Sequence, residues 1–331
     1  MAEKAYKRTA PFITAAENVS GIMLDVLIAL LPAVAWAVYM FGLSSLKVLG
    51  VSVAACVASD MIMSLIFRRR LGITDLSAVV SGVILGLTLP YDVPLLLPAA
   101  GGAFGMIVIK GLSGGIGKNI FNPAISGRIF VAALWGEKLA TDTYKNGMEL
   151  LDTVNGGQLS PVPLVDMFIG NRDGAMGEIS ILLLCAGAAY LLMRRTVTWH
   201  TTAGYIGGAV AACLLLCEHY DTLRWTLSQL FAGGLVFCAV FAVNDMCTSP
   251  LSRGGKVIYG AVAGALGILF RVYLPYTEGV WIAILAANAI ARLIDTLYVP
   301  RPFGKRMKIV PVAEKEAEKE AVSAEAAEEN K

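Results

Sequence analysis

Charged residues are scarce in this 331-residue chain, at 16% of the sequence, whereas a soluble domain usually carries about 25%. Apolar residues make up 56%, and the mean hydropathy is +0.67. The net charge is only +2, and no segment forms a dense basic patch, which argues against a nucleic-acid partner. This composition indicates an integral membrane protein that lies in a lipid bilayer.

Residues that commonly ligate metals are also few. The two histidines, His200 and His219, flank one apolar segment, and we interpret both as interfacial. Six cysteines are scattered through apolar runs, and only Cys213 and Cys217 are spaced one helical turn apart. We interpret the cysteines as buried thiols, with a metal or redox role as the alternative. With no zinc or Walker motif present, we predict no metal site and no catalytic residue.

Long polar stretches are rare, and apolar runs of roughly membrane-spanning length fill most of the chain. The first 20 residues are polar and the first apolar run is too long for a signal sequence, so we expect no cleavable signal peptide. About ten spans are expected, some of them short: 22–41, 46–66, 77–91, 94–110, 123–135, 177–193, 202–218, 228–243, 257–274 and 279–298.

Basic residues set the expected orientation. With the N-terminus inside, most Lys and Arg residues fall in inner connections, as the positive-inside rule requires. The largest outer connection, 136–176, is acidic. The prediction is therefore a polytopic all-α membrane protein with both termini in the cytoplasm.

Five expected spans precede the long outer connection and five follow it, so the two halves have opposite orientations. The fifth and tenth spans each pair an Asn with an Arg four to six residues later: Asn122 with Arg128, and Asn288 with Arg292. Inverted repeats of this kind place sites near the membrane midplane, where the repeats meet. We divide the chain into a cytoplasmic N-terminus (1–21), a first five-helix half (22–135), an outer loop (136–176), a second five-helix half (177–306) and a cytoplasmic tail (307–331).

The stretch Gly111–Arg128, GLSGGIGKNIFNPAISGR, is glycine-rich and polar although it lies between two apolar runs. Non-helical backbone near membrane depth is tolerated only where protein buries it or a cavity solvates it. The Asn122–Pro123 pair is typical of a helix start. This stretch therefore predicts a site between helices. Within it, Arg128 would face a cavity or an anionic group, or extend to the inner surface.

Several motifs resemble one known family over about residues 10–306. They include Asp75-Leu-Ser-Ala78, Gly114-Gly-Ile-Gly-Lys-Asn-Ile-Phe-Asn-Pro-Ala124, Asn244-Asp-Met-Cys-Thr-Ser-Pro250, Tyr276-Thr-Glu-Gly279 and Pro300-Arg-Pro-Phe-Gly304. These motifs resemble the D subunit of Rnf electron-transport complexes, and the related B subunit of the sodium-pumping NADH:quinone reductase shares much of the pattern.

The resemblance implies a ten-helix inverted repeat similar to that of urea transporters. It also implies a bacterial inner-membrane subunit that carries flavin. The whole complex would be a translocase-type oxidoreductase that moves electrons between ferredoxin and NAD while pumping Na⁺ or H⁺. Its other members would be the A, E and G membrane subunits and the B and C peripheral subunits. No complete catalytic site is expected in this chain alone.

The family attaches FMN through its phosphate to a Thr in the outer loop, and this chain departs from that motif. The corresponding stretch is Asp152-Thr-Val-Asn-Gly-Gly-Gln158, where Gln158 replaces the acceptor Thr. A glutamine side chain has no hydroxyl to form a phosphoester. Three interpretations stay open: no covalent FMN, attachment at Ser160, or attachment at Thr153.

A second, non-covalent flavin such as riboflavin is also implied by the resemblance. The flavin ring needs apolar walls and hydrogen-bond donors. Two polar breaks in the apolar pattern, Gly114–Asn122 and Asn244–Thr248, could supply the donors; the alternative is that these breaks only cap helices. The candidate residues are Gly114, Gly115, Lys118, Asn119, Asn122, Arg128, Asn244, Asp245 and Thr248.

A function of a different class competes with the redox role. The same repeat fold could form a channel or transporter for a small solute or cation, without redox work. The missing acceptor at Gln158 favours this alternative, whereas the length of the resemblance favours the electron-transport subunit.

Overall fold

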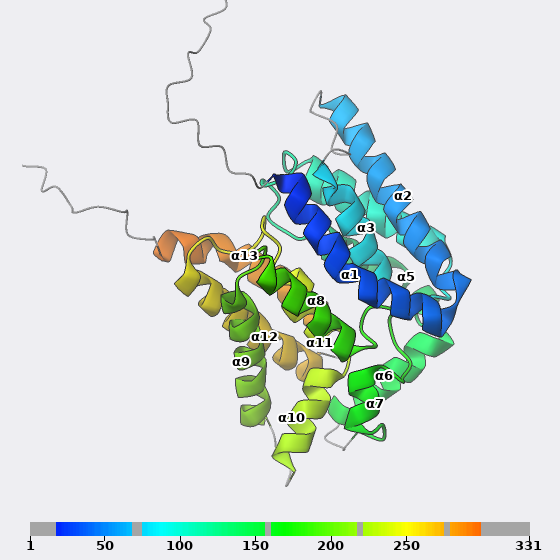
Figure 1. The fold of residues 1–331 in the computed structure, drawn as a ribbon, viewed down its shortest axis with the longest axis vertical. Coiled ribbons are helices and arrows are strands. Elements are labelled where there is room, and N and C mark those ends of the chain that lie inside the picture. The colour runs from blue at the N-terminus through cyan, green and yellow to red at the C-terminus, as the bar shows by residue number, and fades with distance from the viewer. Residues whose placement is uncertain (1–17, 68–74, 156–159, 217–220, 275–278, 299–331) are drawn as a thin grey trace, which may run out of the picture. The chain divides into compact units, whose positions relative to one another are not determined.

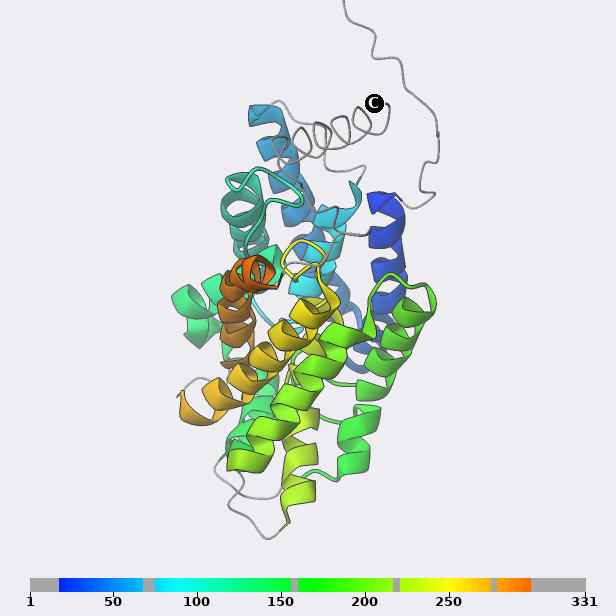
Figure 2. The same ribbon diagram turned by 90° about the vertical axis from the view of Figure 1, so that its left-hand side faces the viewer.

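The computed structural model describes residues 18–67, 75–155, 160–216, 221–274 and 279–298. Within these ranges the regular structure is helical and contains no strand (Figures 1 and 2). The elements are α1 (Val19–Phe41), α2 (Leu43–Ile66), α3 (Ser77–Leu87), α4 (Leu96–Phe104), the π-helix η2 (Gly105–Gly111), α5 (Pro123–Leu139), α6 (Asp142–Asn155), α7 (Leu164–Ile169), α8 (Ile181–Met193), α9 (Trp199–Leu216), α10 (Thr222–Phe231), α11 (Leu235–Phe237), the π-helix η3 (Cys238–Ala242), α12 (Arg253–Tyr273) and α13 (Gly279–Leu297).

Among the residues that the structure describes, five helices are long and apolar enough to cross a membrane: α1, α2, α9, α12 and α13. Three shorter apolar helices, Ser77–Leu87, Leu96–Gly111 and Ile181–Met193, lie where the sequence predicts further spans. The helical, multi-span character of the chain is therefore confirmed, whereas the count of ten spans stays a prediction.

The expected span 228–243 contains a bend. Helix α10 ends at Phe231, and the following helical segment, Leu235–Ala242, is bent from it by 66°. Gly233 takes a positive φ of 62° at the break, a conformation that favours glycine. The apolar run in the sequence continues through the bend, so hydropathy alone does not reveal it.

Side-chain caps define several helix starts. The Asn122 side chain accepts hydrogen bonds from the N–H groups of Ala124 and Ile125, and Pro123 occupies the first turn of α5. The Ser252 hydroxyl likewise accepts from the Gly255 N–H at the start of α12. Because a cap satisfies N–H groups that a helix leaves unpaired, both polar breaks end in well-defined helices.

Glycines bring α9 and α12 into close contact. A Cβ at Gly208 would collide with the backbone of Ala261, and one at Gly264 would collide with the backbone of Tyr205. Small residues allow such close approach between membrane helices, where dispersion contacts supply much of the association energy. The two helices therefore form a tightly packed pair, which α13 extends by packing on α12.

The segment predicted as an outer loop, 136–176, is itself largely helical. Helix α5 extends to Leu139, and α6 and α7 follow. Buried residues of α6, including Leu150 and Leu151, pack with Met167 of α7 and Ala232 in a small apolar cluster. The segment is thus a folded cap on the helices rather than an irregular connection.

Candidate functional site

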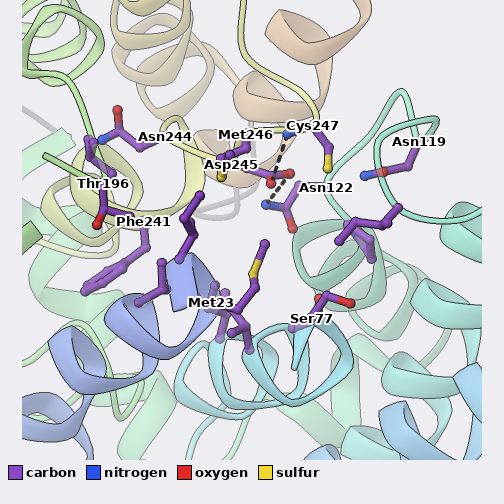
Figure 3. A pocket seen from close by; sticks show the side chains of 18 of the residues that line it. Met23, Ser77, Asn119, Asn122, Thr196, Phe241, Asn244, Asp245, Met246 and Cys247 are labelled. Atoms are coloured by element: carbon purple, nitrogen blue, oxygen red, sulfur yellow. Dashed lines mark hydrogen bonds between the residues drawn. The ribbon is translucent and has the colours of Figure 1, made fainter. Parts of the chain in front are cut away.

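A cavity lies where the polar breaks of the two sequence halves meet (Figure 3). It holds about 770 Å³ of empty space including its mouth, of which about 80 Å³ admits the centres of water-sized molecules. We call it the inner cavity. Its lining comes from α1, α3, η2, the 112–122 connection, the end of α8, and the 240–247 segment. Residues that lie far apart in the sequence therefore share one site.

One wall of the inner cavity is apolar. It is formed by Met23 and Val26 of α1, Ile84 of α3, Leu191 of α8 and Phe241 of η3. In Figure 3, Met23 and Phe241 lie lower in the view than the labelled Asn and Asp side chains. An apolar wall opposite a few convergent polar groups is the usual organisation of a small-molecule site.

The polar side of the cavity is centred on Asn122 and Asp245. Asn122 Nδ2 donates to Asp245 Oδ2 at 3.5 Å, drawn as a dashed line in Figure 3. Asp245 also accepts from the Thr248 hydroxyl at 3.1 Å and from the Cys247 N–H at 3.4 Å. Burial raises the pKa of Asp245, while these two bonds act in the opposite direction.

A second asparagine contacts Asn122, the residue that caps the start of α5. Asn288 of α13, with its amide oriented to satisfy both neighbours, accepts from the Asn122 N–H at 3.2 Å and donates to the Tyr259 hydroxyl at 2.6 Å. The start of α5 is therefore tied to α12 and α13. The two asparagines that the sequence pairs as repeat counterparts lie in direct contact.

Asn119 and Asn244 also line the cavity, although their amide donors are already used locally. Asn119 is 4% exposed and donates to the Phe121 carbonyl at 3.1 Å. Asn244 donates to Thr202 at 2.8 Å and to the carbonyls of Ala239 and Val240 at 3.1 and 2.9 Å. Asn244 therefore supplies a donor to the carbonyls at the end of η3, which positions Asp245.

Other predicted site residues lie outside the cavity lining. Gly114 and Gly115 take φ values of 111° and 97° and shape the connection before α5. Lys118 is exposed, and its carbonyl accepts from Arg292 at 3.3 Å. Thr248 is 3% exposed and acts through its bond to Asp245. These residues support the geometry of the site without facing it.

Arg128 reaches neither the inner cavity nor the inner surface. It is 0% exposed, and its guanidinium donates to the Thr88 carbonyl at 3.0 Å and to the Tyr144 hydroxyl at 2.8 Å. The expectation that it extends to the inner surface is therefore wrong. The Tyr144 ring, 5.4 Å from the guanidinium carbon, also contacts the charge.

Lys110, which is not among the site residues predicted from the sequence, lines the inner cavity from η2. Its Nζ lies 2.8 Å from Asp60 Oδ1 and donates to the Ser77 hydroxyl at 2.9 Å. Both charged side chains are less than a tenth exposed. The signal that could have revealed it is a lone Lys within the apolar run 94–110, since buried charges in spans are costly and are usually paired.

The hydroxyls considered for covalent FMN are both engaged. Ser160 is 4% exposed, donates to the Val162 carbonyl at 2.9 Å and accepts from the Val162 N–H at 3.2 Å. Thr153 donates to the Glu149 carbonyl at 2.7 Å, one helical turn earlier in α6. Gln158 lies outside the described residues. Neither hydroxyl is presented as a free acceptor.

Comparisons with known proteins give a consistent result. Residues 6–304 match the model of the NQR2, RnfD, RnfE family. The chain is 30% identical to the D subunit of the Na(+)-translocating ferredoxin:NAD(+) oxidoreductase complex of Acetobacterium woodii, over 89% of this chain and 94% of the relative. It is 32% identical to the D subunit of the proton-translocating ferredoxin:NAD(+) oxidoreductase complex of Clostridium ljungdahlii, over 90% and 96%. It is also 34% identical to the B subunit of the Na(+)-translocating NADH-quinone reductase of Chromohalobacter salexigens, over 69% of this chain and 60% of the relative.

Proposed function

The chain belongs to the NQR2, RnfD, RnfE family, and we propose that it is the D-type membrane subunit of an ion-translocating ferredoxin:NAD oxidoreductase complex. Two relatives covered over nearly their whole length are named as D subunits of such complexes, one sodium-translocating and one proton-translocating. The complex as a whole is a translocase-type oxidoreductase. This subunit contributes membrane structure and a cofactor site rather than a complete catalytic centre.

The inner cavity is the proposed site of a non-covalent flavin such as riboflavin. Its lining combines an apolar wall with a few convergent polar groups, which is typical of small-molecule sites. The apolar wall around Phe241 suits the flat ring system, and the Asn122–Asp245 side suits its polar edge. Lys110, which is paired with Asp60, adds a charged hydrogen-bond donor next to Ser77. When bound, the flavin supplies electron transfer, while the protein holds and orients the ring.

The proposed flavin is not a covalently attached FMN. Gln158 stands at the position of the family's acceptor Thr, and the hydroxyl of Ser160 is buried within its own turn. A phosphoester at Ser160 would require this turn to open. The chain is therefore proposed to carry flavin without a covalent link.

The proposed architecture is ten spans in two inverted halves, with both termini in the cytoplasm of a bacterial inner membrane. In the proposed repeat, the helices α1, α2, α4 and α5 of the first half correspond to α8, α9, α12 and α13 of the second. Helix α2 packs on α4, and likewise α9 packs on α12. Helix α4 packs on α5, and likewise α12 packs on α13. The equivalent pairs α1 with α8 and α5 with α13 also pack on each other. The bent pair α10 and Leu235–Ala242 would then form one span.

The other members of the complex are the proposed partners: the A, E and G membrane subunits and the B and C peripheral subunits. The relatives are named as parts of complexes, and many large apolar side chains are exposed on the helices of this chain, for example Leu215 at 87%. Lipid covers part of such a surface, and neighbouring membrane subunits would cover the rest.

Visible absorbance of the purified native protein tests the proposal. We expect a flavin band that is lost on denaturation and gel separation, because no covalent bond retains the flavin. Ser81→Phe, which places a ring in the inner cavity, should abolish the band, whereas Val83→Phe on another side of α3 should retain it. Flavin fluorescence that persists in the denatured band, and is removed by Ser160→Ala or Thr153→Ala, would instead establish a covalent link. Absence of flavin from the native protein would contradict the redox role and favour a channel or transporter.

A further inference from the structure

A second cavity, separate from the flavin site, is lined by α6, the 172–179 segment, the break before α11, and α12 and α13. We call it the outer cavity, because most of its lining belongs to the predicted outer segment and to helix ends next to it. It holds about 510 Å³ of empty space including its mouth, of which about 30 Å³ admits the centres of water-sized molecules. This suits a small ion or a few waters rather than a flavin.

Two arginines line the outer cavity, and both have buried donors without a partner among the described residues. Arg271 is 2% exposed and donates through Nη1 to the Gln229 carbonyl at 2.6 Å, but its Nε and Nη2 are unpartnered there. Arg172 donates through Nη2 to the Glu178 carbonyl at 2.6 Å, and its Nε is likewise unpartnered. A buried N–H that lacks an acceptor destabilises the fold, and more so when the group is charged.

The charge of this cavity is also only partly balanced. Glu178 lines it and offsets one of the two positive charges. Asp173 lines it as well, but its side chain is exposed and accepts from Asn146 at 2.8 Å. Burial and the nearby Arg271 lower the pKa of Arg172 to about 10, with Glu178 acting in the opposite direction. Arg172 therefore stays protonated at neutral pH, and within the cavity lining one buried positive charge remains without a buried counter-charge.

We propose that the outer cavity binds a small monovalent anion, a halide or a small carboxylate, between Arg172 and Arg271. Such an anion accepts hydrogen bonds from the unpartnered guanidinium nitrogens and neutralises the excess charge. Since the lining combines the 172–179 segment with α6, α12 and α13, the bound anion fastens the outer helical cap to the second half of the chain. The site does not depend on the flavin.

Thermal unfolding of the purified protein tests the site with chloride and acetate as the anions. Each sodium salt replaces sodium gluconate, whose anion is too large for the cavity, at constant ionic strength and constant Na⁺. We expect a saturable rise of the unfolding midpoint with chloride, acetate or both, because an anion that binds only the folded state stabilises it. The anion that produces the rise identifies the source, and ³⁵Cl line broadening reports chloride binding directly.

Three variants separate the proposal from a general salt effect. Arg172→Gln should raise the half-saturating concentration about tenfold or more, the effect of losing one charge-assisted hydrogen bond. Glu178→Gln should lower it, because the competing carboxylate is removed. Arg224→Gln, at an exposed arginine of α10, should behave as the wild type. No saturable rise in the wild type, or the same rise in Arg172→Gln, would overturn the proposal and leave a cavity filled by water only.

Discussion

At the scale of single residues, the Lys110–Asp60 pair shows what burial does to a charge. Lys110 Nζ and Asp60 Oδ1 are 2.8 Å apart and both side chains are less than a tenth exposed, whereas Lys145 and Asp142 lie 3.8 Å apart with side chains 62% and 100% exposed. Exposed pairs contribute about 0–1 kcal/mol. Breaking a buried pair is costly because the remaining charge loses its compensation.

We predict that Lys110→Met destabilises the folded protein by about 3–5 kcal/mol, whereas Lys145→Met changes its stability by less than about 1 kcal/mol. Chemical unfolding in detergent, followed by intrinsic fluorescence, measures both. The double variant Lys110→Met/Asp60→Asn should recover part of the loss, because no unpaired charge remains. Equal effects of the two lysine substitutions would show that the buried pair contributes no more to the free energy of unfolding than the exposed pair.

The positions of these charges along the chain were visible in the sequence, but their pairing was not. Lys110 and Asp60 are separated by α3 and α4, and only the packing of η2 against α2 brings them together. The partners of Arg128 were likewise not visible in the sequence. Its acceptors come from Thr88 and Tyr144, which no spacing rule connects to it.

At the scale of helices, the contact between α9 and α12 depends on glycine. Gly208 faces the backbone of Ala261, while Gly207, the preceding residue, is exposed, and a Cβ added there would meet nothing within 4 Å. The two positions therefore form a matched pair within one helix. A substitution at Gly208 tests the close approach of the two helices, whereas a substitution at Gly207 tests helix propensity alone.

We predict that Gly208→Ala lowers the thermal unfolding midpoint, because the added methyl group forces the two helices apart. Gly207→Ala should leave the midpoint unchanged or raise it, since alanine is favoured over glycine in a helix by about 1 kcal/mol. Differential scanning fluorimetry of the purified variants compares them. A destabilisation of the same size at both positions would contradict close packing as the cause.

At the scale of the whole molecule, the proposed orientation in the membrane rests on the basic residues. The connections proposed to be inner are rich in Lys and Arg, and the 136–176 segment is acidic. Asn146 lies in this segment with an exposed side chain, and Ser323 lies in the tail.

We predict that an impermeant thiol reagent added to sealed cells labels Asn146→Cys but not Ser323→Cys, each in a background without native cysteines. Ser323→Cys should become reactive once the cells are permeabilised, which serves as the control for its accessibility. Labelling of Ser323→Cys in sealed cells, or failure to label Asn146→Cys, would reverse the proposed topology.

The sequence by itself determined the membrane class, the positions of the apolar helices, the helix start at Asn122–Pro123 and the family. Each of these depends on local composition, local hydrogen bonding or the order of motifs, and all three are properties of the sequence itself. The tertiary structure decided the bend after Phe231, the Lys110–Asp60 pair, the burial of Arg128 and the meeting of Asn122, Asn288 and Asp245 around one cavity. These features depend on which helix faces pack together, and a pairing between distant segments is fixed by three-dimensional contact rather than by spacing along the sequence.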